Sequence, residues 1–268
     1  MDRRGSSAPS TPAHPRRHVL RRGLISLAGA NLTAQIAAGK AGALGERARM
    51  TTQLEDEKKL AAEAAAALVE DGMSVGLGTG STVAYFLPAL ARRKLSLRCV
   101  ATSPHTEEAA QALGIFVEAF NGVDRLDIAV DGADQIAPEG WLVKGGGGAH
   151  TREKLVAATA DRFVVIADST KPVENLHPPI PLELLLFGLS STLRRLAPIE
   201  VRDVPTSPDG GVIADFAGEL GDLFELAAWF EAAPGVVEHG LFPPELVDSI
   251  LIGRGSDVEL SVPRRPVA

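Results

Sequence analysis

The sequence predicts an α/β fold, with a parallel-sheet, Rossmann-like (doubly wound) main domain and a smaller α+β domain. Two observations predict it. Short apolar runs alternate with helical stretches over residues 55–167, which is the pattern of a parallel sheet with helical crossovers. After residue 178 this alternation gives way to strand-like stretches with few helices, which is typical of an α+β domain.

The main domain is expected to open with an Ala-rich helix over residues 55–70, followed by an apolar strand over 73–77. Further helices are expected over 81–93, 105–113 and 149–160, and further strands over 98–101, 115–118, 126–130, 141–143 and 163–167. Ligands of open parallel sheets gather at the carboxyl ends of the strands, so the loops at that edge are the first place to look for chemistry.

The Pro-rich segment 177–181 is expected to be a rigid linker into the smaller domain. That domain is expected to contain strands over 182–186, 199–204, 212–216 and 236–238, and one helix over 221–232. The apolar run 247–253 is expected to return to the main sheet. The predicted division is therefore a catalytic α/β domain of residues 50–178 plus 242–268, and a small α+β domain of residues 179–241.

Charge is distributed unevenly. Residues 1–49 carry nine Lys and Arg against two Asp and Glu, whereas residues 50–268 carry 18 against 32. We expect 1–49 to be a disordered basic leader or an extension upstream of a start at Met50. An organellar transit peptide and an export signal remain alternatives. The acidic remainder argues against a nucleic-acid partner, and the uncharged run 23–39 is too short and too polar for a membrane span.

The sequence offers few residues for a disulfide or a metal site. Cys99 is the only cysteine, which excludes an intrachain disulfide and favours a reducing, cytoplasmic compartment. The six histidines show neither HxH nor HExxH spacing, so no histidine metal site is expected.

The first distinctive loop is GLGTGST at 76–82, which contains Thr79, Gly80, Ser81 and Thr82. Glycines let backbone N–H groups approach an anion at the start of a helix. The pattern matches neither a dinucleotide fingerprint nor a Walker loop. It fits a tight strand–helix turn as well as an anion cradle.

Two further loops carry polar side chains. Thr102 and Ser103, with Thr106 after them, could hold a sugar or a phosphate, or Ser103 could simply cap a helix. The run Asp131-Gly132-Ala133-Asp134 leaves an apolar strand. Its carboxylates could bond sugar hydroxyls and relay protons, or they could form an Asx turn.

The fourth loop, KGGGGAHTREK, covers 144–154. Four successive glycines cost backbone entropy and suit a backbone that wraps a ligand. Lys144 places a cation at the entrance of this run, and Glu153 falls in the first turn of the following helix, where an acid is also ordinary capping chemistry. Lys171 adds a cation after another strand, and taken alone it would be an ordinary surface lysine.

Together these loops resemble the type A family of ribose-5-phosphate isomerases. The matching stretches are GLGTGST at 76–82, ATSPHT at 101–106, DGAD at 131–134, VKGGGGAHTREK at 143–154, ADSTK at 167–171, PLELLLFG at 181–188, PGVVEHGLF at 234–242 and ILIG at 250–253. The resemblance extends over residues 50 to 260 or so.

The resemblance implies an aldose–ketose isomerase that interconverts ribose 5-phosphate and ribulose 5-phosphate in the non-oxidative pentose phosphate pathway, without metal or cofactor. It implies Glu153 as general base, Lys144 as the cation that stabilises an enediolate, and Asp131 as an aid to ring opening. A phosphosugar partner and a homodimer or homotetramer are also implied. The substrate-binding residues implied are Thr79, Gly80, Ser81, Thr82, Asp131, Gly132, Ala133, Asp134, Lys144, Gly145, Gly146, Gly147 and Lys171, with Lys58 or Lys59 as a further phosphate ligand.

The sequence departs from the family pattern in places. Gln135 stands where the family usually has Glu, His150 stands where an apolar residue is common, and residues 207–211 replace a TDNGN-like stretch. The connection 188–206 is shorter than usual. Two other classes remain alternatives: a phosphosugar-sensing domain of a regulator, for which a basic helix-turn-helix is missing, and a coenzyme A transferase relative, for which a nucleotide-binding surface is missing.

Overall fold

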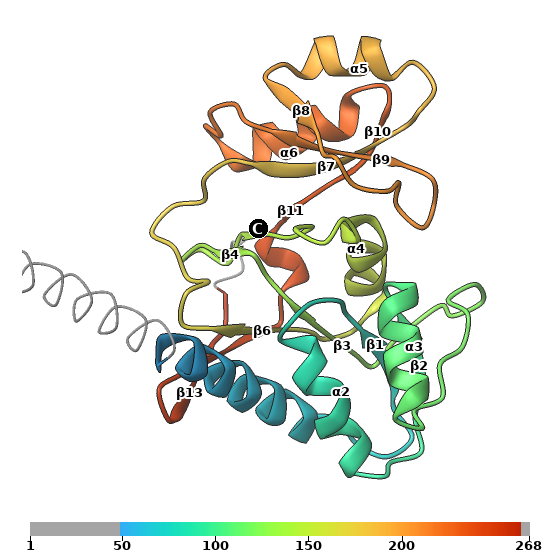
Figure 1. Ribbon diagram of the computed structural model, residues 1–268, viewed down its shortest axis with the longest axis vertical. Helices are drawn as coiled ribbons and strands as arrows, with labels where there is room; N and C mark the ends of the chain where they lie inside the picture. Colours follow the sequence, from blue (N-terminus) through green and yellow to red (C-terminus); the bar gives the residue numbers. More distant parts are fainter. Residues whose placement is uncertain (1–48, 264–268) are drawn as a thin grey trace, which may run out of the picture. The chain divides into compact units, whose positions relative to one another are not determined.

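The computed structural model describes residues 49–263, so the expectation of a disordered leader lies outside the described residues. Of the described residues, 50–263 belong to one compact unit. Its described part contains a six-stranded, a four-stranded and a three-stranded sheet. Figure 1 shows the four-stranded sheet with α5 and α6 at the top of the view, and the six-stranded sheet with α2 and α3 below.

The six-stranded sheet has the order β13-β12-β6-β3-β1-β2, and all its pairs are parallel except β12 with β13. Its strands are β1 (Ser74–Leu77), β2 (Arg98–Ala101), β3 (Ile128–Gly132), β6 (Phe163–Asp168), β12 (Ser249–Arg254) and β13 (Asp257–Ser261). Leu77 pairs with both Ala101 and Val130, so β1 and β2 end level with one another, while β3 continues to Gly132. This alignment brings the loops that follow them to one edge.

Helices cover both faces of this sheet, as the doubly wound prediction requires. They are a first helix whose described residues are 49–67, α2 (Val83–Arg92), α3 (Pro104–Ala112) and α4 (His150–Thr159). Alternate strand residues face opposite ways. Ile128 and Val130 therefore pack with the first helix and α2, whereas Ala129 and Val165 pack with α4. The parallel α/β fold is confirmed.

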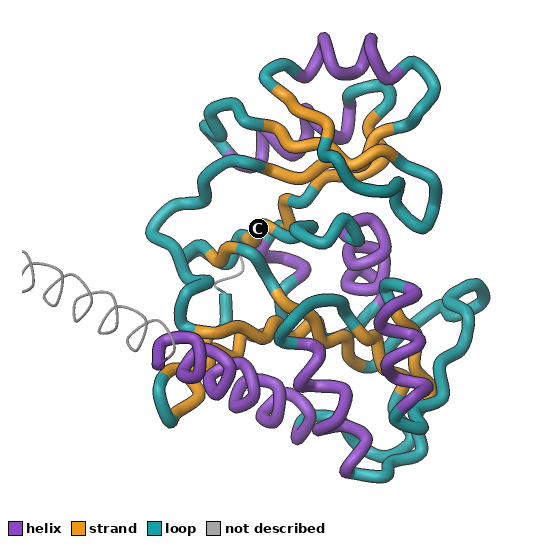
Figure 2. Tube along the Cα trace, in the orientation of Figure 1, coloured by secondary structure: helices purple, strands orange, loops and turns teal. Residues whose placement is uncertain are grey.

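The four-stranded sheet is antiparallel, with the order β10-β7-β9-β8. Its elements are β7 (Ile180–Leu184), α5 (Leu189–Leu196), β8 (Ile199–Val201), β9 (Val212–Phe216), α6 (Leu223–Ala232) and β10 (Val236–His239). Leu182, Phe216 and Phe230 are buried together between this sheet and its helices, apart from the core of the large sheet. Figure 2 shows the two sheets joined by extended loops.

The third sheet is small and antiparallel, with the order β11-β5-β4; in sequence β4 and β5 fall between β3 and β6, and β11 falls between β10 and β12. It consists of β4 (Gln135–Ile136), β5 (Leu142–Val143) and β11 (Leu241–Phe242), and a short 3₁₀ helix, η1 (Pro244–Leu246), follows it. Lys144 comes directly after β5, and its backbone N–H donates to the Gly240 carbonyl at 2.9 Å. The lysine therefore leaves a paired strand with its backbone already fixed.

Several local predictions need correction. The expected strand at 115–118 is wrong, because Val117 makes only one isolated bridge to Cys99. The expected linker 177–181 ends early, since Ile180 already pairs in β7. The first helix lies toward the N-terminus of its predicted span, and α5 and β13 were not anticipated. The division at residues 178 and 242 remains a prediction.

Among the helices of residues 49–263, none combines the length and apolar character needed to cross a bilayer. The same residues contain no group of three or more His, Cys, Asp or Glu side chains arranged to hold a metal ion.

Candidate active site

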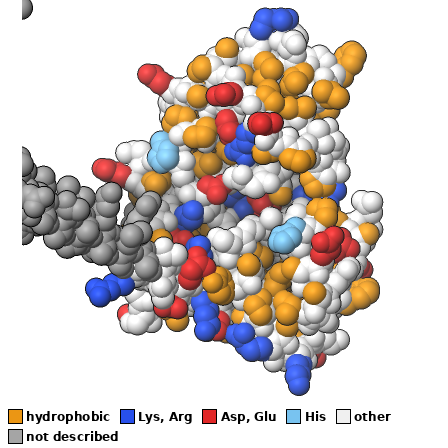
Figure 3. All heavy atoms as spheres, viewed as in Figure 1, with side chains coloured by type: hydrophobic (Ala, Val, Ile, Leu, Met, Phe, Trp, Pro, Cys, Tyr) orange, Lys and Arg blue, Asp and Glu red, His pale blue; other side chains and the backbone are white. Residues whose placement is uncertain are grey.

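A pocket opens where the loops after β1, β3 and β6 meet the glycine run. Its cavity volume is about 110 Å³. Its lining residues are Thr79, Gly80, Ser81, Thr82, Gly132, Ala133, Asp134, Lys144, Gly145, Gly146, Gly147, Glu153 and Lys171. The structure thus brings together the sequence-predicted binding residues of the loops except Asp131, which lies directly behind this wall; Lys58 and Lys59 are not part of the lining. Figure 3 shows charged side chains of both signs gathered in the hollowed band across this face.

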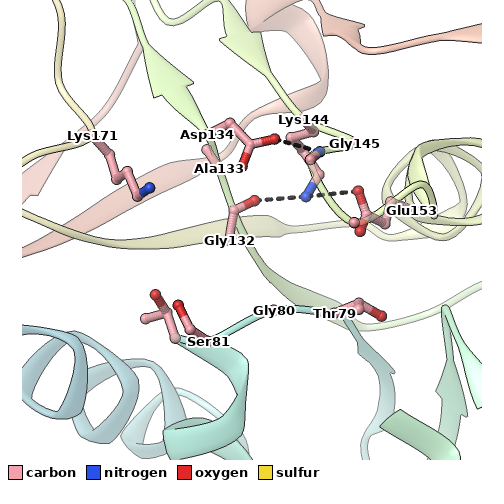
Figure 4. A pocket seen from close by; sticks show the side chains of 13 residues that line it. Thr79, Gly80, Ser81, Gly132, Ala133, Asp134, Lys144, Gly145, Glu153 and Lys171 are labelled. Carbon is pink, nitrogen blue, oxygen red and sulfur yellow. Dashed lines mark hydrogen bonds and ion pairs between the residues drawn. The ribbon is translucent and has the colours of Figure 1, made fainter. Parts of the chain in front are cut away.

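Lys144 is the centre of the site's chemistry. Its Nζ lies 3.0 Å from Asp131 Oδ2 and 3.1 Å from Glu153 Oε2, and it donates to the Gly132 carbonyl at 2.6 Å. Figure 4 shows the ammonium group between Gly132 and Glu153. The three side chains are at most 5% exposed. A buried cluster with one cation and two carboxyl groups can hold or release a proton at little geometric cost.

The Asp131 carboxylate is fixed by backbone donors. Its Oδ1 accepts the N–H of Thr79 at 3.0 Å and that of Gly132 at 2.7 Å. Gly78 permits this approach, because a Cβ added there would overlap the Asp131 carboxyl carbon. The GLGTG loop therefore holds the Asp131 carboxylate through its backbone as well as lining the pocket.

Glu153 stands in the first turn of α4, as predicted, and is buried. One oxygen, Oε2, faces Lys144. No hydrogen bond within residues 49–263 engages the other oxygen, Oε1, although Glu153 lines the pocket. Since capping of α4 does not use this side chain, Oε1 is available to accept a proton from a bound molecule.

Burial and charge shift the acid–base behaviour of the cluster. Burial raises the pKa of Glu153 to about 8, with the Asp131 carboxylate adding to the rise and Lys144 opposing it. Burial likewise raises the pKa of Asp131. Burial alone would lower the pKa of Lys144, but the two carboxylates reverse this and raise it. Lys144 therefore stays charged near neutral pH, while Glu153 titrates in that range.

The hydroxyl groups at the edge of the sheet mostly bond one another. The Thr79 hydroxyl lies 2.8 Å from the hydroxyls of Thr102 and Ser103 and 3.0 Å from that of Thr106. Ser103 caps α3, because its Oγ accepts the Thr106 N–H at 3.1 Å. The second loop thus orients the first, and Thr79 points away from Ser81 in Figure 4.

The start of α2 provides a different environment. Thr82 occupies its N-cap position without a side-chain cap bond, and Gly80 adopts a φ of 133°, in the region that favours glycine. No hydrogen bond within residues 49–263 engages the backbone N–H of Ser81, Thr82 or Val83. Figure 4 shows Lys171 extending over Ser81 on the side of the pocket opposite Glu153. Free N–H groups with a nearby ammonium group suit an anion.

The glycine run forms a turn held from two sides. The Gly148 N–H donates to the Gly145 carbonyl at 3.0 Å, and the Gly146 N–H donates to Asp134 Oδ2 at 2.7 Å. From the four-stranded sheet, Arg202 donates to the Gly145 carbonyl at 2.9 Å and the Gly146 carbonyl at 3.0 Å. Sequence reasoning missed Arg202, because nothing near it in the sequence indicates a contact 56 residues away.

The departures from the family pattern lie around the site rather than in it. Gln135 exchanges hydrogen bonds with the backbone of His177, at 2.8 and 2.9 Å. His150 is fully buried beneath Gly145, and burial lowers its pKa to about 3, so its ring is uncharged. Lys58 pairs with Glu55 at 2.8 Å, and neither Lys58 nor Lys59 is among the described residues that line the pocket.

The fold and site define a class: a doubly wound α/β protein whose pocket contains a buried carboxylate–lysine–carboxylate cluster and the start of a helix with unpaired N–H groups among residues 49–263. The sequence profile of ribose 5-phosphate isomerase A (phosphoriboisomerase A) matches residues 98–257. The chain belongs to this family.

Individual relatives agree along almost their whole length. The chain is 45% identical to "Ribose-5-phosphate isomerase A" of Caulobacter sp. (strain K31), over 78% of this chain and 99% of the relative. It superposes on the ribose 5-phosphate isomerase A structure from Methanocaldococcus jannaschii with a TM-score of 0.74 and 35% identity, over 78% and 99% of the two chains. A D-ribose-5-phosphate isomerase solved in complex with phospho-erythronic acid gives a TM-score of 0.73 and 32% identity, again over 78% and 99%.

Proposed function

We propose that this protein interconverts D-ribose 5-phosphate and D-ribulose 5-phosphate through an enediolate. One observation carries the proposal: a buried lysine lies between two carboxylates at the wall of a pocket whose opposite side suits a phosphate. The family membership supports the same reaction. A sensing domain or a coenzyme A transferase relative is not favoured by the relatives.

The phosphate is assigned to the start of α2. The free N–H groups after Gly80 and the hydroxyls of Ser81 and Thr82 supply donors, and Lys171 supplies charge. This contact is the same before, during and after the reaction, so it contributes binding rather than acceleration. It also directs the other end of the sugar toward Lys144 and Glu153.

The proton transfer is assigned to Glu153. Oε1 removes the proton from C2 of the open-chain aldose, and the electron pair of the C–H bond moves toward the carbonyl at C1 to form the enediolate. The same carboxyl group then returns a proton to C1, which gives the ketose. A single carboxylate can do both because the two carbons are neighbours on one face.

Lys144 and Asp131 are assigned to act on the sugar oxygens at C1 and C2. The ammonium group offsets the negative charge that develops on the sugar oxygens, without a metal ion. During the reaction one proton also passes from the C2 oxygen to the C1 oxygen. Asp131, hydrogen-bonded through Oδ1 and paired with Lys144 through Oδ2, is positioned to assist this transfer and the opening of the ring.

The direct test is isomerisation of ribose 5-phosphate, followed by NMR in D₂O. The expected result is ribulose 5-phosphate with deuterium at C1, at a rate that glucose 6-phosphate and unphosphorylated ribose do not approach. A protein that binds ribose 5-phosphate but never converts it would support a sensing domain instead.

The expectations on assembly and compartment are part of the same proposal. A homodimer or homotetramer is expected from the family resemblance, and sedimentation of the full chain would measure it. A cytoplasmic location is expected because Cys99 is the single cysteine of the sequence and cannot form an intrachain disulfide.

A further inference from the structure

The four-stranded sheet reaches the pocket through one side chain. Arg202 follows β8 and forms a fork with Asp215 of β9, with two N···O distances of 2.6 Å. This pair fixes the plane of the guanidinium group. Its remaining nitrogen, Nη1, then donates to two successive carbonyls of the glycine run, those of Gly145 and Gly146.

These two hydrogen bonds determine which way the peptide groups of the run face. In a trans peptide the C=O and the following N–H point in opposite directions. The peptide between Gly145 and Gly146 shows this directly, because its carbonyl accepts from Arg202 while its N–H donates to Asp134 Oδ2 at 2.7 Å. Asp134 lines the pocket, so the side opposite Arg202 is the pocket side.

The next peptide has the same orientation but no partner on its pocket side. The Gly146 carbonyl accepts from Arg202 at 3.0 Å, so the N–H of Gly147 points away from Arg202. No hydrogen bond within residues 49–263 engages that N–H, and Gly147 lines the pocket. A glycine run without side chains would otherwise be free to turn this peptide over.

We infer that Arg202 is a positioning residue that holds the glycine run so that the Gly147 N–H donates to the anionic end of the reacting sugar. The inference rests on the proposed function and adds to it a donor and the means by which that donor is aimed. Arg202 itself does not reach the substrate. Its effect passes through one peptide group, whose hydrogen bond strengthens as the oxygen of the substrate becomes negative.

The test compares catalysis with the binding of a charged analogue. Phospho-erythronic acid carries a carboxylate at the end of the molecule where the enediolate carries its charge. Arg202→Met keeps the bulk of the side chain and removes its donors. We expect kcat to fall about 10–100-fold, somewhat less than the loss of a complete oxyanion donor. The inhibition constant of phospho-erythronic acid should rise by a similar factor, while that of erythritol 4-phosphate, whose end is neutral, should change less than threefold.

A matched control separates this effect from the loss of an ion pair. Arg125 forms a comparable fork with Asp161 on the surface, away from the pocket, and its Nε lies 2.9 Å from Asp161 Oδ1. Arg125→Met should leave kcat and both inhibition constants as in the wild type. If Arg202→Met merely unfolded part of the protein, the active fraction would fall, but the inhibition constants of the remaining active protein would not change.

A double-mutant cycle identifies the route. Gly147→Pro removes the N–H, and Gly147→Ala keeps it at a position where an added Cβ meets nothing within 4 Å. The Pro variant should be slower than the Ala variant, and Arg202→Met should then slow the Pro variant less than threefold further. If the double variant instead lost kcat by the full product of the two single losses, the inference would be overturned. A folded Arg202→Met protein with wild-type kcat and wild-type inhibition by phospho-erythronic acid would overturn it as well. A wild type that does not isomerise ribose 5-phosphate would instead overturn the proposed function.

Discussion

Replacing Asp131 with Asn should make Glu153 a stronger acid, and the structure gives the size of the change. Asp131 Oδ2 and Glu153 Oε2 lie 3.0 and 3.1 Å from the same Nζ, so the two oxygens are at most about 6 Å apart. Two unit charges at that distance repel by roughly 3 kcal/mol at an effective dielectric constant of about 20. That energy corresponds to about 2 pKa units.

The direction of the change in the pKa of Glu153 follows from the repulsion between the two carboxylates. The Asp131 carboxylate opposes a second negative charge and helps to raise the pKa of Glu153 to about 8. With Asn at 131 the ionised form of Glu153 becomes easier to reach, and Lys144 no longer divides its attraction between two carboxylates. The pKa of Glu153 should therefore fall by about 1–2 units.

The assay is kcat/KM against pH, since its acid limb reports the base of the free enzyme. In the wild type, activity should rise as pH increases toward 8. In Asp131→Asn the maximum will be lower, but the limb should move to lower pH. The substrate phosphate also titrates near 6, in the same way for every variant.

Asp134→Asn is the matched control, because Asp134 is in the same loop and raises the pKa of Glu153 least among the charges named for it. The acid limb of the kcat/KM profile of Asp134→Asn should shift by less than about 0.5 pH unit. A limb that stays in place or moves to higher pH in Asp131→Asn would refute the electrostatic reasoning.

The remaining predictions concern single side chains. Glu153→Gln should lower kcat about 10²–10⁴-fold, with deuterium incorporation falling in parallel; near-normal turnover would leave Glu153 a structural acid. Lys171→Ala should mainly raise KM, and Lys144→Met should mainly lower kcat. A mainly lower kcat in the first variant and a mainly higher KM in the second would mean that the two lysines have the opposite roles. Activity should survive EDTA, and reversible loss restored by a divalent ion would reveal a metal requirement. Burial opposes ionisation of Glu57, but hydrogen bonds from Ser169 and Gly255 lower its pKa to about 2. The ionised side chain therefore stabilises the fold above its usual pKa of 4.5, and this stabilisation is lost as pH falls toward 2. Urea unfolding of Glu57→Gln should depend less on pH in that interval, and an unchanged dependence would contradict this.

The parallel sheet was predictable from sequence because its central strands are largely apolar and lead into glycine-containing loops. β6 is buried at all six positions, and β1 and β3 lead directly into the GLGTG and DGAD loops. The short elements were not predictable. α5 begins after Gly188 in the left-handed region with no side-chain cap, and β13 has mostly exposed side chains, so neither carries the usual local signal.

The identity of the site residues was also readable in the loops, but their relations were not. No local pattern indicates that Thr79 would act through its N–H while its hydroxyl bonds the start of α3. These relations depend on strand alignment, which places residues 52 positions apart next to each other. Arg202 is hidden for the same reason, since its partners in the glycine run come from another sheet.

The close approach of Gly78 to the Asp131 carboxylate has a practical consequence for anyone who wants to alter the substrate range. A library that randomises the pocket loop would treat position 78 as free, since no side chain is present to be lost. Yet every other amino acid would displace the aspartate, and most clones would be inactive before their new specificity could be seen. Diversity is better placed at Ala133, which lines the pocket without closing on a reacting group.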